Sequence, residues 1–343
     1  MDSELPEVRA FSGRLLAWYR QAKRDLPWRR TRDPYAIWIS EIMLQQTRIA
    51  AAIPFYQRFL ARFPDFESLA SASEPDLLAH WAGLGYYYRA RNMQKAAQSM
   101  VEAGRFPDTY ESIRALAGVG EYTAAAVASI AFGLPHAVVD GNVFRVLSRV
   151  SNDNTDILST SGKRRFAAMA NTLLDPDCPG EHNQALMELG ATVCLPKNPQ
   201  CLVCPVADVC AARKRGRQHE LPVKNRVQRA VEQHRTLYWI ERAEEILVWQ
   251  RGPYSRLMPG FWELPEAEQI GTLEGSHSLG VFTHTITFHN YRFKVMRAST
   301  PLELGPCQWM SKDKLSSLPL STIFKKAQGV VSKSLRAALA AGT

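Results

Sequence analysis

No apolar run in this sequence approaches the roughly 20 residues that a membrane-spanning helix needs. The first 30 residues carry several charged side chains and lack the apolar core of a signal peptide. There is also no internal repeat and no low-complexity tract. These absences argue against a membrane protein, a secreted protein and a repeat protein, so we expect a soluble, cytoplasmic protein.

The chain has 343 residues, which is too many for one typical core, so we expect two domains. Residues 1–217 are rich in alanine and show helical patterns broken by proline and glycine, which predicts an all-α domain. Residues 235–343 contain β-branched and aromatic runs separated by turn signals, followed by a helical pattern. The sequence therefore predicts a multidomain protein, with a small α+β domain after a basic interdomain linker at 218–234.

The net charge of +9 favours a polyanionic partner such as nucleic acid. The densest basic stretch runs from Arg213 to Arg229, where seven basic residues face Glu220 alone. On charge alone, this stretch is equally well explained as a solvated linker.

Four of the six cysteines form one compact series at 194–210, with the spacing C-x6-C-x2-C-x5-C. In a chain without a signal peptide, clustered thiolates indicate a metal rather than disulfides. Either Zn²⁺ or an iron–sulfur cluster takes four thiolates, but zinc ribbons usually pair two C-x2-C knuckles at a longer separation. A single knuckle in a short loop favours a [4Fe–4S] cluster, held by Cys194, Cys201, Cys204 and Cys210.

A glycine hairpin joins two predicted helices in "LAGVGEYTAAAV", residues 116–127. Gly118, Val119 and Gly120 give a tight turn whose backbone N–H groups can bind phosphate at a helix N-terminus. Such a pair of glycines is weak evidence by itself. Asp140 follows in "VVDGNVFRV" and reads most simply as a helix N-cap.

Glu41 lies in the apolar stretch "WISEIMLQQTR", residues 38–48. Read as a helix, this segment places Ile37, Glu41, Leu44 and Arg48 on one face. Burying a carboxylate there costs several kcal/mol unless it is paired or protonated, so we expect burial to raise the pKa of Glu41.

Together, these motifs resemble the helix–hairpin–helix DNA glycosylase superfamily, and within it the MutY-type adenine DNA glycosylases. The resemblance covers essentially the whole chain, and "LPWRRTRDPYAIWISEIMLQQTR", "WAGLGYYYRARN", "VVDGNVFRV" and the cysteine loop carry it most specifically. Where the family's hairpin usually has proline, this chain has Ala117. The resemblance implies base excision repair of adenine opposite 8-oxoguanine or guanine.

The resemblance assigns the chemistry to two carboxylates. Glu41 would protonate N7 of a flipped-out adenine and then handle the attacking water. Asp140 would stabilise the oxocarbenium-like sugar, as paired carboxylates do in sugar hydrolysis, and this role takes precedence over the simple N-cap reading. Tyr122 and Asn142 match positions that support these carboxylates.

Two departures from relatives narrow the expected activity. Endonuclease III-like relatives carry a lysine nucleophile where this chain has Tyr122, so no Schiff base forms there and a monofunctional glycosylase is implied. In the second domain, "MPGFWELP" at 258–265 resembles the start of a Nudix domain of MutT type. The Nudix metal-binding carboxylate series does not follow it, so a Nudix-like fold used for lesion recognition is implied.

The resemblance also implies the binding residues. The adenine pocket would be formed by Trp28, Arg29, Leu44 and Gln184, although core packing explains Trp28 and Leu44 equally well. DNA and lesion recognition would involve Gln46, Thr47, Leu84, Tyr86, Gly118, Val119, Gly120, Phe282, Thr283 and His284. Gln46 and Tyr86 would wedge into the duplex, and Phe282-Thr283-His284 matches an F-S-H loop that contacts 8-oxoguanine, with Thr283 in place of serine.

We therefore expect a monomeric enzyme acting on mispaired double-stranded DNA. The cluster would shape a loop that presents Lys197 and the Arg213–Arg217 run to phosphates. Two alternatives stay open from the residues alone: a bifunctional glycosylase/lyase for oxidised pyrimidines, which needs an amine at position 122, and a non-enzymatic redox-sensing DNA-binding protein, which leaves Glu41 unexplained.

Overall fold

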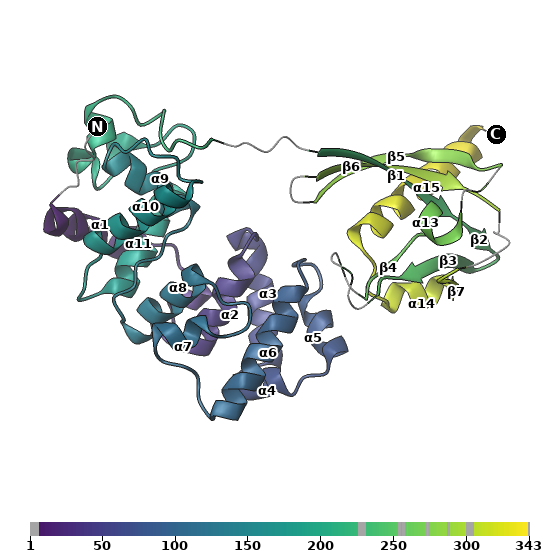
Figure 1. Cartoon of the computed structure of the whole chain (residues 1–343), viewed down its shortest axis with the longest axis horizontal. Coiled ribbons are helices and arrows are strands. Elements are labelled where there is room, and N and C mark those ends of the chain that lie inside the picture. Colours follow the sequence, from purple (N-terminus) through teal and green to yellow (C-terminus); the bar gives the residue numbers. More distant parts are fainter. Residues whose placement is uncertain are drawn as a thin grey trace. The chain divides into compact units, whose positions relative to one another are not determined.

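The computed structural model describes residues 7–225, 231–252, 255, 258, 260–271, 273, 275–286, 289–299 and 305–341, without the side chains of 316–317 and 338–341. The chain divides into two compact units, Met1–Arg226 and Val227–Thr343. Figure 1 shows that the first is built of helices and the second of strands with a few helices. Among the described residues, no helix is long and apolar enough to cross a membrane.

The helical unit confirms the predicted all-α domain. Its elements are α1 (Val8–Ala22), η1 (Pro27–Arg29), α2 (Pro34–Leu44), α3 (Ile49–Arg62), α4 (Phe66–Ala70), α5 (Glu74–Trp81), α6 (Tyr88–Ala103), α7 (Tyr110–Arg114), α8 (Glu121–Phe132), α9 (Gly141–Val150), α10 (Thr160–Leu173), α11 (Pro179–Thr192), η2 (Cys201–Val203), η3 (Ala207–Val209) and α12 (Ala211–Lys214).

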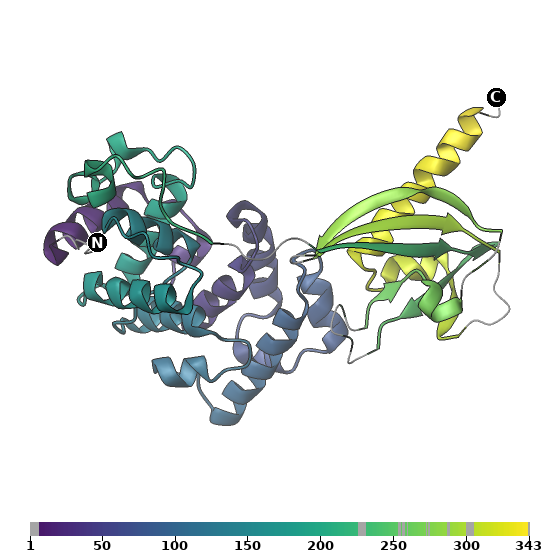
Figure 2. The ribbon, with the colours of Figure 1, turned by 45° about the horizontal axis from the view of Figure 1, so that its top comes forward.

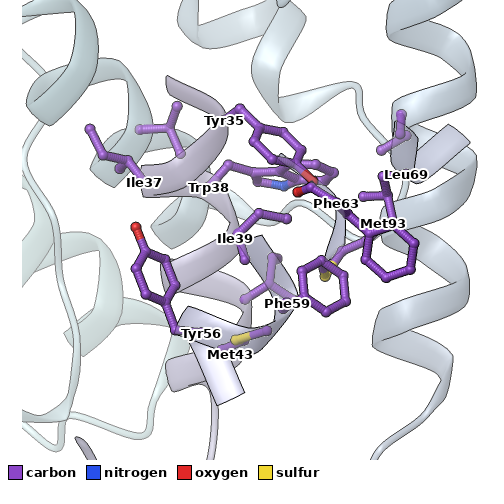
Figure 3. Packing of buried hydrophobic residues seen from close by; sticks show 14 of the residues in the cluster. Tyr35, Ile37, Trp38, Ile39, Met43, Tyr56, Phe59, Phe63, Leu69 and Met93 are labelled. Atoms are coloured by element: carbon purple, nitrogen blue, oxygen red, sulfur yellow. The ribbon is translucent and has the colours of Figure 1, made fainter. Parts of the chain in front are cut away.

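Helix α2 runs through the larger of the unit's two main apolar cores. Its residues Tyr35 to Met43 are all buried, and Trp38 and Ile39 pack among side chains of α3 and α6 such as Phe59 and Met93 (Figure 3). Pro34 occupies the first turn, and the Asp33 side chain caps it by accepting from two backbone N–H groups. A helix that is apolar on nearly every side is a buried one. Glu41 is therefore forced into the protein interior.

The predicted helical face that carries Glu41 wrongly included Arg48 at its C-terminal end. Helix α2 ends at Leu44, and Arg48 is instead the N-cap residue of α3. The break occurs because Gln45 is extended and Gln46 has a φ of 59°, which no α-helix accommodates. Arg48 therefore does not share a helix face with Glu41.

The smaller core of the helical unit joins the two ends of its sequence. Helix α1 packs against α10 and α11, and α9 packs against α10 and α11 as well. Phe11 and Leu15 of α1 lie in the same cluster as Leu147 and Leu189. This packing fixes α9 and α11, which carry Asp140 and Gln184 toward α2.

The second unit has the α+β composition that the sequence predicts. It contains β1 (Val231–Trp239), β2 (Glu241–Arg242), β3 (Glu245–Gln250), β4 (Trp262–Glu263), α13 (Ala267–Ile270), β5 (His277–Ile286), β6 (His289–Arg297), β7 (Cys307–Ser311), α14 (Lys312–Ser317) and α15 (Thr322–Ala341). One sheet has the order β1-β6-β5, with β1 parallel to β6, and the other has β3 between β4 and β7 with β2 alongside. Helix α15 packs on β5 and β6 (Figure 2).

The basic stretch between the units is partly structured at both of its ends. Leu221 is buried with Cys210 and Ala212 in the helical unit, and its carbonyl accepts from Arg149 Nε at 3.0 Å. Strand β1 begins at Val231, inside the range 218–234. Residues 226–230, including Arg226 and Arg229 of the basic patch, lie outside the described residues.

Candidate active site

A cavity of about 240 Å³ lies in the helical unit, where α2, α8, α9 and α11 meet η1. It brings together all of the residues predicted for catalysis and adenine binding. The predicted residues that line it are Trp28, Arg29, Glu41, Leu44, Thr47, Tyr122, Asp140, Asn142 and Gln184.

Glu41 is a buried acid in this cavity whose pKa is raised. Its side chain is only 5% exposed, and Oε2 has no hydrogen-bond partner among the described residues. Burial raises the pKa of Glu41 to about 7, and the Asp140 charge adds to this rise, while the Tyr122 hydroxyl and Arg29 oppose it. A carboxyl with this pKa is an acid that can donate a proton near neutral pH.

Asp140 caps helix α9, as the simplest interpretation of the sequence predicted, and it also lines the cavity. Its Oδ1 accepts from the Val143 backbone N–H at 2.7 Å, and its Oδ2 accepts from Asn142 Nδ2 at 2.9 Å. Burial raises the pKa of Asp140, and these hydrogen bonds oppose the rise. Asn142 can lie this close to α11 because Gly190 faces it: a Cβ at Gly190 would stand 2.6 Å from the Asn142 Cβ.

Tyr122 lies beside both carboxylates on the first turn of α8. Burial raises the pKa of its phenol well above the usual value, and the charges of Glu41 and Asp140 raise it further. The phenol therefore stays neutral, and its hydroxyl donates to the Met187 sulfur at 3.5 Å. No lysine lines the cavity in the part of the chain that the structure describes.

Glu188 is the main residue of this site that the sequence did not reveal. Its side chain is 1% exposed and accepts from Arg29 Nη2 at 2.7 Å and from Arg24 Nε and Nη2 at 2.7 Å each. Burial alone would raise the pKa of Glu188, but the hydrogen bonds from Arg24 and Arg29 outweigh it and lower the pKa to about 2. The sequence did contain a signal for Glu188: it follows Gln184 by four residues, and positions four apart lie on the same face of a helix.

Gln184 and Trp28 are held by aromatic neighbours. Gln184 Oε1 accepts from the Tyr19 hydroxyl at 2.7 Å, which leaves the amide nitrogen as its free donor end. Trp28 is buried and packs edge-on against Tyr56, with ring centroids 5.4 Å apart. Trp28 and Leu44 pack with the apolar core, as predicted, and they also line the cavity.

Gln46 and Tyr86 stand on two neighbouring loops in left-handed backbone conformations, with φ of 59° and 48°. Such values are uncommon outside glycine and mark strain that the surroundings must support. The support is Arg89, a buried side chain that the sequence also did not reveal. Its Nη1 donates to the carbonyls of Ile42 and Gln45 at 2.8 and 2.7 Å, and its Nη2 donates to those of Leu84 and Gly85.

Gln46 and Tyr86, the two predicted wedges, are exposed to solvent, unlike Leu84. Gln46 is exposed, and the Tyr86 side chain is 44% exposed and packs edge-on against Tyr88. Leu84, in contrast, is buried in the larger core, where it supports the loop from beneath.

The predicted hairpin joins α7 to α8, and Gly118 is the residue that its shape requires. Gly118 has a φ of 78°, and a Cβ there would approach the Asn92 Cβ to 2.8 Å. The Val119 N–H donates to the Leu116 carbonyl at 3.1 Å, and Gly120 is the N-cap of α8. The absence of proline at Ala117 therefore leaves the turn intact.

The four predicted cysteine ligands surround one cavity at the end of the helical unit. None of them is in a disulfide, and Arg149 Nη1 lies 3.2 Å from Cys194 Sγ. Among the described residues, no three ligands converge closely enough for a single metal ion. Four thiols around a cavity suit a cluster, whose ligands are spread over several iron atoms. Lys197 is exposed on this loop.

Phe282, Thr283 and His284 lie within strand β5, not in the loop that was expected. Strand alternation separates them: Phe282 is half-buried and stacks on Phe293, whereas Thr283 is exposed. The Thr283 carbonyl accepts from Lys326 Nζ at 3.0 Å. Burial, then the Lys326 charge, lowers the pKa of His284. In the 258–265 motif, Pro259 lies outside the described residues.

Comparison with known families gives two matches in this chain. Residues 39–170 match the HhH-GPD superfamily base excision DNA repair protein, and residues 194–210 match the iron-sulfur binding domain of endonuclease III. The first match spans the segments that carry Glu41, Tyr122 and Asp140, and the second spans all four cluster cysteines.

Curated relatives match over most of the chain. The adenine DNA glycosylase of Homo sapiens is 36% identical over 94% of this chain and 74% of that protein. That of Buchnera aphidicola subsp. Acyrthosiphon pisum is 32% identical over 70% of this chain and 72% of that protein. The Mus musculus protein of the same name is 46% identical over 64% of this chain, but this chain spans only 45% of that protein.

Solved structures share the fold of a large part of the chain. A thermostable thymine-DNA glycosylase superposes with a TM-score of 0.55 and 29% identity, covering 61% of this chain and 97% of that one. An endonuclease III in a non-covalent DNA complex gives a TM-score of 0.51 at 23% identity, covering 61% and 96%. At that identity the second match speaks for the fold alone.

Proposed function

We propose, from the premise that this chain belongs to the adenine DNA glycosylases, that it removes adenine mispaired with 8-oxoguanine or guanine in double-stranded DNA. The family resemblance and the fold class predicted from the sequence are confirmed, as is the iron–sulfur cofactor. One observation carries the mechanistic proposal. A single cavity holds an acid with a pKa of about 7 beside a second carboxylate, and no lysine lines it among the described residues.

The first step requires the target nucleotide to leave the duplex, because the N-glycosidic bond is inaccessible in the base stack. Protonated Glu41 would then donate its proton to N7 of adenine. The bond between the sugar C1′ and the base N9 breaks, and its electron pair leaves with the protonated base. Burial of Glu41 supports this role, because about half of its side chains carry the proton at neutral pH when the pKa is about 7.

The second step stabilises the sugar cation left behind. Asp140, held by Val143 N–H and Asn142 Nδ2, would place its negative charge or a transient covalent bond against C1′. Glu41, now ionised, would take a proton from the attacking water, whose oxygen bonds to C1′. This returns Glu41 to its acid form, and the neutral phenol of Tyr122 supports both carboxylates.

Recognition of the base would come from the other side of the cavity. Gln184 has its oxygen occupied by Tyr19, so its amide N–H₂ is free to donate to a ring nitrogen of adenine. Arg29 is fixed by Glu188, which it shares with Arg24, so the pocket contains a cation that is already held in place. Trp28 and Leu44 supply the apolar walls for the ring.

Contacts with DNA would surround this cavity. Exposed Gln46 and Tyr86 would enter the base stack beside the mispair, and the hairpin at Gly118–Gly120 would bind phosphate. In the second unit, taken by itself, Thr283 of β5 is the exposed residue of the Phe282–His284 group, so it is the one that would contact the base opposite adenine. We also propose that the protein acts as a cytoplasmic monomer.

The [4Fe–4S] cofactor binds at Cys194, Cys201, Cys204 and Cys210. Base removal is redox-neutral, so this group would order the loop and thereby present Lys197 to the phosphate backbone. No proton transfer in the cavity requires it.

The test is base removal from a defined duplex. Pure protein is incubated with DNA carrying adenine opposite 8-oxoguanine or guanine and then treated with alkali, which cleaves abasic sites. Alkali-dependent breaks at the adenine are expected with both duplexes, and a cytosine-paired control should stay intact. Absence of alkali-labile product would refute the proposal. Breaks that appear without alkali at the rate of base loss would instead identify a bifunctional enzyme.

A further inference from the structure

A second cavity, of about 260 Å³, adjoins the adenine cavity, which holds Glu41, in the helical unit. Arg29, Ile130 and Gln184 line both cavities, so these three side chains form the partition between them. The rest of the second cavity is lined from α1, the loop after η1, the end of α8 and the start of α11. The proton transfers at Glu41 make no use of this neighbouring space.

Excision requires one place beside the sugar to hold two different groups in turn. Glu41 would first donate to N7 of adenine and later accept a proton from the attacking water, and both groups must then lie close to C1′. The water therefore reaches its position only after the free base has moved away. At that moment the sugar is still part of the DNA strand, which covers the side from which the nucleotide entered. A space on the protein side of the cavity would let the base withdraw while the strand stays bound.

Gln184 is the part of the partition that can move. One neutral hydrogen bond, from the Tyr19 hydroxyl at 2.7 Å, holds its side chain among the described residues. Such a bond contributes little net free energy, so thermal motion can break it. Arg29, in contrast, donates to Glu188 at 2.7 Å and to the Arg24 carbonyl at 3.1 Å. Rotation of the Gln184 side chain would therefore open a passage beside a fixed arginine.

The second cavity has the polar groups that a free purine base requires. Asp177 contributes a carboxylate acceptor, and Lys23 and Arg32 contribute cationic donors. Free adenine has donors at its 6-amino group and at N9, and acceptors at its other ring nitrogens. The cavity volume is below the roughly 300–1,000 Å³ of pockets that hold drug-sized ligands, which suits a single bicyclic base.

We propose that the second cavity receives the excised adenine as a free, neutral base, and that the base passes Gln184 to reach it. This inference rests on the proposed excision of adenine and adds a binding site for its product. Departure of the base into the second cavity leaves Glu41 open to the attacking water. It also keeps the base from returning to C1′.

Binding of free adenine to a complex whose first cavity is already filled tests this site. The full chain is saturated with a duplex carrying 2′-fluoro-2′-deoxyadenosine opposite 8-oxoguanine, in which the fluorine destabilises the sugar cation and keeps the base attached. Free adenine is then added, and its binding is measured by calorimetry and by saturation transfer to its H2 and H8 protons. Saturable binding with a Kd on the order of 1 mM or below is expected. No adenine binding to the saturated complex would overturn the proposal.

This measurement involves no bond cleavage, so it separates the second site from the excision itself. Alkali-labile product from an ordinary adenine duplex, without binding of free adenine, would refute the second site and leave the excision standing. Binding of free adenine without alkali-labile product would refute the excision and leave the binding site standing.

A variant that fills the second cavity locates the binding. Asp177 is exposed and lines only the second cavity, so Asp177→Trp introduces a ring of about the size of adenine there. Binding of free adenine is expected to weaken by at least about tenfold. Single-turnover base loss should slow by about tenfold, because the base has no room to withdraw. Affinity for the 2′-fluoro duplex should stay unchanged, which separates a blocked exit from a damaged adenine cavity.

Thr172→Trp is the matched control, since Thr172 is exposed on α10 and lines neither cavity. It should match wild type in all three measurements. If Asp177→Trp does not fold, Lys23→Trp introduces the same ring from an exposed position on the α1 side of the cavity. Unchanged adenine binding in a folded Asp177→Trp or Lys23→Trp protein would contradict this site.

Discussion

Replacing Glu41 with glutamine should inactivate the protein and, at the same time, make it more stable above neutral pH. The side chain is buried, and its pKa rises from 4.5 to about 7 on folding. A shift of that size corresponds to about 3 kcal/mol of differential interaction between the acid and the carboxylate. The folded state therefore favours the protonated form by this amount.

The pH dependence follows from the sign of this shift. Below the unfolded value of 4.5, Glu41 is protonated in both states and carries no penalty. As the pH rises from 4.5 to about 7, the unfolded chain loses its proton first, and wild type loses about 3 kcal/mol of stability from this group. Glutamine does not titrate, so the variant keeps that stability.

Urea denaturation of both full-length proteins, followed by far-UV circular dichroism, measures the difference. The stability of Glu41→Gln relative to wild type should increase by about 3 kcal/mol between about pH 4.5 and about pH 8. Adenine excision should fall by at least about 10²-fold, the usual contribution of a general acid. A stability difference that is the same at both pH values would refute the claim that burial perturbs Glu41.

Glu188→Gln is the matched control, because its shift has the opposite sign. Hydrogen bonds from Arg24 and Arg29 lower the pKa of Glu188 to about 2. Its contribution to stability is therefore present above the unfolded pKa of 4.5 and is lost as the pH falls toward 2. Glu188→Gln should destabilise the protein at neutral pH, where Glu41→Gln stabilises it.

Four further substitutions test other parts of the site. Asp140→Asn should lower the rate of base loss by about 10²-fold or more while leaving stability nearly unchanged in urea denaturation, because asparagine is an equally good N-cap. Tyr122→Lys should create a protein–DNA adduct that borohydride traps, which wild type does not form. Arg89→Met should weaken binding to mispaired duplex by about tenfold in gel-shift titrations, because four backbone carbonyls at the end of α2 and in the two loops lose their donor. Cys204→Ser should abolish the broad visible absorption of the cluster and weaken duplex binding at low salt.

The hairpin, the cysteine spacing and the helical character of residues 1–217 could all be read from the sequence, because each depends on residues that are close in the chain. The residue at which helix α2 ends could not be read from the sequence. Its helical pattern continues to Arg48, but the loop that carries Gln46 is held in a strained conformation by Arg89, about forty residues further along. Helix propensities depend on residues that are near in the chain, so they cannot predict a contact with a residue this far away.

In the second unit, too, the sequence identified residues but not their tertiary surroundings. Phe282-Thr283-His284 was recognised as a group, but its residues were assigned to a loop and lie in a strand, where Phe282 stacks on Phe293. Glu263 stands in a motif that the sequence identified. Its burial and its ion pair with Arg251 depend on the pairing of β3 with β4, which the motif does not reveal.

The sequence by itself determined which reactive groups this protein has. It supplies a carboxyl in an apolar helix, a phenol where a lysine would permit strand cleavage, and four thiols at cluster spacing. Only the tertiary structure decided what these groups can do. Packing of α1 against α10 and α11 carries Asp140 to within reach of Glu41, about a hundred residues earlier, and burial by the surrounding helices raises the pKa of Glu41 to about 7. A pKa depends on the dielectric and the charges around a group in space, and neither is encoded by its neighbours in the chain.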